Sequence, residues 1–101
     1  MQFTFTPRNR SLPPITLDGD VLGIAMTAAD HRNVKFVPIG YSIAEDGPTT
    51  VSRRNAKKVS RILIRIARNL SVMQRPEYVE SLLLFAASLL DSRGGELKIQ
   101  R

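Results

Sequence analysis

The sequence predicts an α+β domain, in which a small antiparallel sheet, mostly from the N-terminal half, is covered by two antiparallel C-terminal helices. Two observations carry this prediction. The first half consists of short apolar runs separated by Pro, Gly and Asp, which is typical of strands and turns. The second half contains two longer segments, 50–70 and 76–90, in which apolar residues recur at helical spacing. No linker-like tract divides residues 1–101, so a single domain is expected.

The first elements are expected to be strands. Met1–Thr6 alternates Phe with Thr and predicts a short strand, after which Pro7–Pro14 forms a proline-rich loop. Ile15–Leu17 predicts a second strand that turns at Asp18-Gly19, because this dipeptide adopts the positive φ angles of a type I′ hairpin turn. The returning strand is expected to run from Val21 to about Ala28.

The middle of the chain is expected to complete an antiparallel meander. Val34–Ile39 predicts another strand, with Tyr41–Ile43 as an extension, and Pro38 indicates that this segment lies at an edge or a break. A loop over Glu45–Pro48 then leads to the first long helix, for which Thr49 or Thr50 is the expected N-cap.

The second half predicts two helices. The first is expected over about 50–70, and the second begins near Pro76, a residue that suits the first helical position. Gly94-Gly95 is expected to end the second helix. The alternation over Glu96–Gln100 is compatible with a last strand.

The positive charge of the chain is concentrated in one segment. The formal net charge is +6, and eight of the 15 Lys and Arg residues lie between Arg53 and Arg75. The rest of the chain contains the other seven Lys and Arg residues and all nine acidic residues, so it is slightly acidic. This asymmetry favours an electrostatic surface on one element over a general contribution to solubility.

On a helix, six of these charges fall on one side, opposite Val59, Leu63 and other apolar residues; they are Arg54, Lys57, Lys58, Arg61, Arg65 and Arg68. Like charges four residues apart, and Arg53 and Arg54 near the positive end of the helix dipole, together cost about 1–2 kcal/mol. An anionic partner would offset this cost. We call the following residues the basic stripe: Arg53, Arg54, Lys57, Lys58, Arg61, Arg65 and Arg68.

Nucleic-acid phosphates are the most common partner for such a surface. The stripe itself has no aromatic residue for base stacking and few Asn or Gln residues for reading base edges, although Ser52, Asn55 and Ser60 could add polar contacts. The alternative is a solvated helix face, or one paired within the fold with acids such as Glu45 and Asp46.

The second helix supports a different function. It is more apolar than one buried face requires, and an excess of this kind favours either a fully buried helix or a surface for a homodimer or another protein. In the second case the chain would be a protein-binding regulator or inhibitor, of the kind encoded by phages or mobile elements, whose basic stripe meets an acidic protein surface. Leu84 is expected to lie off the buried face of this helix. The candidate interface residues are Tyr78, Leu84 and Phe85.

Catalysis is not expected. The single histidine, His31, lies between Asp30 and Arg32 in a polar turn, and the chain has no cysteine, phosphate-binding loop or metalloprotease motif. We therefore expect no catalytic residue, metal, cofactor or small-molecule substrate. The longest apolar run is too short to cross a bilayer, so we expect no membrane partner and a cytoplasmic location.

Overall fold

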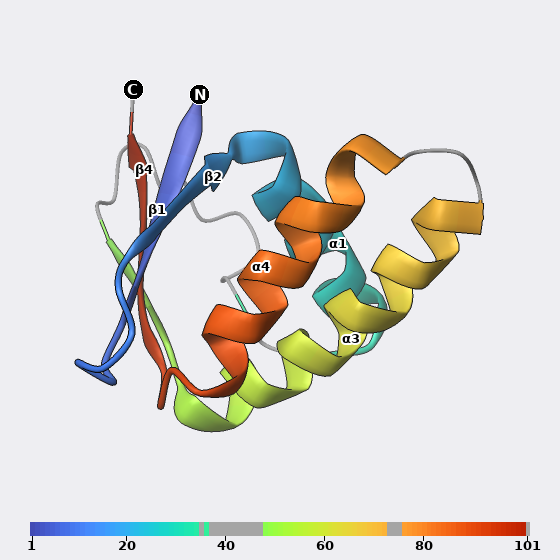
Figure 1. Ribbon diagram of the computed structural model, residues 1–101. Coiled ribbons are helices and arrows are strands. Elements are labelled where there is room, and N and C mark those ends of the chain that lie inside the picture. Colours follow the sequence, from blue (N-terminus) through green and yellow to red (C-terminus); the bar gives the residue numbers. More distant parts are fainter. Residues whose placement is uncertain (35, 37–47, 73–75, 101) are drawn as a thin grey trace.

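The computed structural model describes residues 1–34, 36, 48–72 and 76–100, and within these ranges strands occur at both ends of the chain (Figure 1). A short 3₁₀ helix, η1, precedes the last α-helix. The elements in chain order are β1 (Gln2–Pro7), β2 (Ile15–Asp18), α1 (Gly19–His31), β3 (Thr49–Val51), α3 (Arg53–Val72), η1 (Pro76–Tyr78), α4 (Val79–Leu90) and β4 (Gly95–Gln100).

The strands form a four-stranded antiparallel sheet in the order β2-β1-β4-β3. The predicted last strand is confirmed and is an inner strand, because β4 pairs with both β1 and β3. In Figure 1 the helices lie on one side of this sheet. Phe3, Phe5 and Leu97 are fully buried, whereas their strand neighbours such as Thr6 and Glu96 are exposed. The α+β class is therefore confirmed, although the sheet draws its strands from both ends of the chain.

An aromatic cluster joins α4 to the sheet. The ring of Phe85 packs edge-on against Phe3, with centroids 5.2 Å apart, and against Phe5 at 5.8 Å. Phe36 contributes a third ring at 6.0 Å from Phe85. Edge-to-face pairs of this kind add about 0.5–1.5 kcal/mol beyond the buried area. Leu82 and Leu89, on the same face of α4, are also fully buried.

The predicted hairpin at Asp18-Gly19 is wrong, because helix α1 begins there. The backbone N–H of Asp20 donates to Oδ1 of Asp18 at 2.8 Å, so Asp18 is the N-cap of α1. The segment expected to be a returning strand buries Val21, Leu22, Ala25, Ala28 and Ala29. Spacings of three, four and seven residues along this set suit one helix face and do not suit a strand.

The start of α3 also differs from the prediction. Thr49 and Thr50 lie in strand β3, and Ser52 caps the helix. The Ser52 hydroxyl accepts from the N–H of Asn55 at 3.2 Å, and its carbonyl accepts from the N–H of Ala56 at 2.9 Å. Strand pairing with β4 therefore occupies the threonines that were expected to cap the helix.

The second predicted helix is confirmed, but its end is not formed by the two glycines. Helix α4 ends at Leu90, and its C-cap is Asp91. Gly94 has a φ of +86°, and Gly95 is the first residue of β4. A Cβ atom on Gly95 would collide with the carbonyl oxygen of Thr6, so the close approach of β1 requires glycine at this position.

Several predictions fall on residues whose structure is not described. The extension over 41–43 lies entirely outside the described residues, and so does most of the predicted strand 34–39 and of the loop 45–48. Within these segments, Phe36 is buried and Val34 is half-buried.

Candidate nucleic-acid interface

Helix α3 carries the predicted basic stripe. Its 20 residues give a rod about 30 Å long. Figure 1 shows it running antiparallel to α4, with α1 behind the pair. Among the described residues α3 contacts α4, α1 and η1. These neighbours hold the helix through its apolar side and determine which side faces solvent.

The inner face of α3 is well buried. Ala56, Val59, Leu63 and Ala67 have at most 1% of their surface exposed and belong to the main hydrophobic core. The buried hydroxyl of Ser60 donates to the carbonyl oxygen of Ala86 at 2.6 Å. This hydrogen bond aligns α3 with α4. It also removes Ser60 from the polar groups that were expected to contact a partner.

The outer face of α3 is cationic along nearly its whole length. All seven residues of the basic stripe are exposed, and α3 contains no acidic residue. From Arg53 to Arg68 the stripe extends over about 23 Å of helix. Within the described part of the chain, no carboxylate lies within ion-pairing distance of these seven side chains. The structure thus leaves all seven predicted residues exposed on α3.

The stripe is electrostatically unfavourable for the isolated protein. Arg54–Lys58, Lys57–Arg61 and Arg61–Arg65 are like-charged pairs at four-residue spacing, each of which costs a few tenths of a kcal/mol. Glu45 and Asp46, the acids expected to neutralise the stripe in the alternative interpretation, lie outside the described residues.

The outer face of α4 has a different character. Leu83, Leu84 and Leu90 are 44%, 52% and 41% exposed, and the small side chain of Ala87 is exposed between them. We call these four residues the leucine patch. The sequence identified Leu84 as lying off the buried face, but it did not separate Leu83 and Leu90 from the core residues of this helix. Leucine and phenylalanine occur on several sides of this helix, so the sequence carries no signal that separates Leu83 and Leu90 from the core residues.

The expected interface role of Phe85 is wrong, because this residue is fully buried against Phe3 and Phe5. Tyr78 is half-buried, and its hydroxyl donates to Oδ2 of Asp20 at 3.2 Å. Tyr78 therefore links the start of the last helix to α1.

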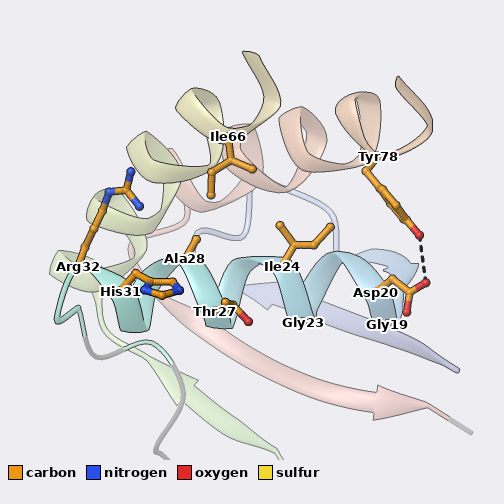
Figure 2. A pocket seen from close by; sticks show the side chains of 10 residues that line it. All are labelled: Gly19, Asp20, Gly23, Ile24, Thr27, Ala28, His31, Arg32, Ile66 and Tyr78. Carbon is orange, nitrogen blue, oxygen red and sulfur yellow. Dashed lines mark hydrogen bonds between the residues drawn. The ribbon is translucent and has the colours of Figure 1, made fainter. Parts of the chain in front are cut away.

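An open depression of about 720 Å³ runs along α1 and is also lined by Ile66 of α3 and Tyr78 of η1. The Tyr78–Asp20 hydrogen bond lies at one end, and His31 and Arg32 lie at the other (Figure 2). Gly23, Ile24, Thr27 and Ala28 of α1 lie between them, and of these only Thr27 carries a polar side chain, a hydroxyl. Across the described ranges, no three His, Cys, Asp or Glu side chains gather to hold a metal ion.

No protein-family model matches the chain, and no characterised protein or solved structure is significantly similar to it. None of the helices in the described part of the chain is long and apolar enough to cross a membrane. The physical character of the two outer helix faces is therefore the basis for the functional argument.

Proposed function

We propose that this protein is a non-enzymatic nucleic-acid-binding module that uses the basic stripe of α3 to contact phosphates. The observation that carries the proposal is the exposure of all seven stripe residues on a helix that has no acidic residue. Each guanidinium can donate two parallel hydrogen bonds to a phosphate, and each lysine supplies a compact positive charge. Neutralising phosphates releases condensed counterions, which provides the driving force for binding.

The binding should depend little on base sequence. Base edges are read mainly by bidentate Arg, Asn and Gln contacts within a groove. Helix α3 is flanked by α4 and α1, so its outer side is suited to following a phosphate backbone and poorly suited to deep insertion into a groove. Ser60 is buried and Asn55 is half-buried, which further reduces the polar groups available for reading bases.

A second candidate is a regulator or inhibitor that docks on an acidic protein surface. The observation that favours it is the leucine patch on α4, because exposed apolar side chains next to a charged helix are typical of protein-binding surfaces. The two candidates differ in salt dependence. Phosphate binding falls steeply with salt, whereas a complex with an apolar centre survives moderate salt. For either function we propose a cytoplasmic location, which suits a chain without cysteine.

The test is charge reversal with a matched control. Arg61→Glu with Arg65→Glu changes the stripe, and Arg8→Glu with Arg10→Glu makes the same change in net charge on the exposed loop between β1 and β2. Binding to fluorescent duplex and single-stranded DNA and RNA is measured by anisotropy. The stripe variant should bind much more weakly, with the slope of log affinity against log salt reduced by about two. Equal losses in both variants would show that net charge alone matters, which contradicts a localised site.

A further inference from the structure

The leucine patch on α4 lies on the side of the helix opposite the core. Phe85, Leu82 and Leu89 point inward, and at 100° per residue Ala87 falls on the opposite side. Among the described residues four large apolar side chains are exposed, namely Met1, Leu83, Leu84 and Leu90. Three of the four therefore gather on one helix face.

The order of residues in the patch suits contact with a second copy of the same helix. Leu83 and Leu84 precede Ala87 by four and three residues, and Leu90 follows it by three. Two α4 helices that pack antiparallel about a two-fold axis at Ala87 would bring Leu83 of one copy near Leu90 of the other, and the reverse. The Leu84 side chains of both copies would lie together on the other side of the contact. The small side chain at the crossing point allows close approach of the two helix axes. A surface that matches itself in this way is what a two-fold dimer requires.

The charges along α4 are complementary under the same two-fold rotation. Glu80 is exposed in the first turn of α4, and Arg93 is exposed just beyond its last turn. Positions 80 and 93 are almost equidistant from Ala87, so an antiparallel pair places Glu80 of one copy near Arg93 of the other. Asp91 adds a negative charge at that end. The Ser60–Ala86 hydrogen bond places Lys57 of α3 near the level of Leu89, so α3 contributes a positive charge at the same end.

We infer that the leucine patch is the centre of a homodimer interface, in which the α4 helices of two copies pack antiparallel around Ala87. Arg54, Lys58 and Arg65 lie on the side of α3 away from the Ser60 hydroxyl, and hence away from α4. The dimer therefore leaves this part of the basic stripe open in both copies. A gain in nucleic-acid affinity from the paired stripes rests on the proposed function, but the dimer itself does not.

The first test is the mass of the full chain in solution, measured by sedimentation equilibrium across the micromolar range. The wild type should be a dimer, Leu84→Asp should be a monomer, and Thr27→Asp, an exposed helical position on α1, should remain a dimer. Circular dichroism verifies that each variant is folded. A wild type that is monomeric at all concentrations overturns the inference. The leucine patch would then be a surface for binding a different protein. A Leu84→Asp variant that remains as dimeric as the wild type also overturns it.

The second test reverses the charges at the two ends of α4. Glu80→Arg and Arg93→Glu should each weaken the dimer about tenfold, because attraction becomes repulsion at both symmetric contacts. The double variant should recover wild-type association. Within one chain Glu80 lies about 15 Å along the helix from Leu90, and Arg93 follows the helix end. This separation is well beyond the screening length of about 8 Å, so the rescue must arise between copies. Additive weakening in the double variant would overturn the proposed packing.

The proposed dimer and the proposed nucleic-acid binding can be refuted independently of each other. A folded Leu84→Asp monomer should still bind nucleic acid, with lower affinity than the dimer. If the wild type is a dimer that binds no nucleic acid, the proposed function is wrong and the dimer stands. If the wild type binds nucleic acid as a monomer, the dimer is wrong and the function stands.

Discussion

Helices α3 and α4 pack against each other and bury similar inner faces, yet their outer faces differ. On α3 the buried set includes Val59 and Leu63, and on α4 it includes Leu82 and Leu89, all with 0% exposure. Outside, α3 presents seven cations, whereas α4 presents three leucines with Glu80 and Asp91 beside them. The hydrophobic effect accounts for the inner faces of both helices. It accounts for neither outer face.

The difference shows where function is to be sought in this molecule. A surface selected only for solubility would mix charges of both signs and expose few leucines. Helix α3 departs from that pattern through charge, and α4 departs from it through apolar side chains. Both departures occur on the one helix pair whose register is held by the Ser60–Ala86 hydrogen bond. We interpret this pair as the functional side of the protein.

The largest expected effect contrasts the inner and outer faces directly. Leu63→Ala should lower the free energy of unfolding by about 2–5 kcal/mol, because it opens a cavity at a fully buried site. Leu84→Ala should change it by less than about 0.5 kcal/mol, measured by urea denaturation at a protein concentration where both variants are monomeric. A large loss at Leu84 would mean that the patch supports the fold.

The next effect tests the corrected start of α3. Ser52→Ala should cost about 1 kcal/mol, because it removes the acceptor for the Asn55 N–H. Thr50→Ala, at an exposed strand position, should cost less than about 0.5 kcal/mol. If Thr50→Ala lowered the denaturation midpoint more than Ser52→Ala did, Thr50 would be the N-cap, as the sequence predicted.

Reversal of the stripe should have a smaller effect on stability, and of the opposite sign. In Arg61→Glu with Arg65→Glu, contacts to Lys57, Lys58 and Arg68 become attractive, and of the pairs that involve the two substituted positions only 61–65 remains repulsive. The double variant should therefore be as stable as the wild type or more stable by up to about 1 kcal/mol. Unfolding of this variant would show that the two arginines are structural, and the proposed binding surface would fail.

The smallest effect is the response of stability to salt without a ligand. Screening weakens repulsion along the basic stripe, so sodium chloride should raise the melting temperature of the wild type slightly. The variant with both reversals should respond less, while the loop variant, Arg8→Glu with Arg10→Glu, should respond like the wild type. Equal responses in all three would indicate that the stripe carries no repulsion of its own.

The fold class and both long helices were predictable because their apolar spacing is regular over many residues. The segment Gly19–His31 was not, because Asp before Gly fits both a hairpin turn and a helix N-cap. Helical spacing of Val21, Leu22, Ala25, Ala28 and Ala29 was the competing signal. The pairing of β4 with β1 joins opposite ends of the chain, and local sequence patterns do not determine such contacts.

The candidate site was predictable to different degrees on the two helices. The stripe could be placed on one helix face because it contrasts in charge with the residues around it. On α4 leucine and phenylalanine occur on several sides, so sequence alone could not assign Phe85 to the core and Leu83 and Leu90 to the surface. That assignment follows from which side of α4 meets the sheet, which is a tertiary property.

The most direct test of the account is the salt dependence of wild-type binding to generic duplex and single-stranded DNA and RNA. If the basic stripe contacts phosphates, log affinity should fall linearly with log salt, with a slope that implies about three to six neutralised phosphates. The absence of binding at low salt would contradict the proposal. Helix α3 would then be a surface for an acidic protein.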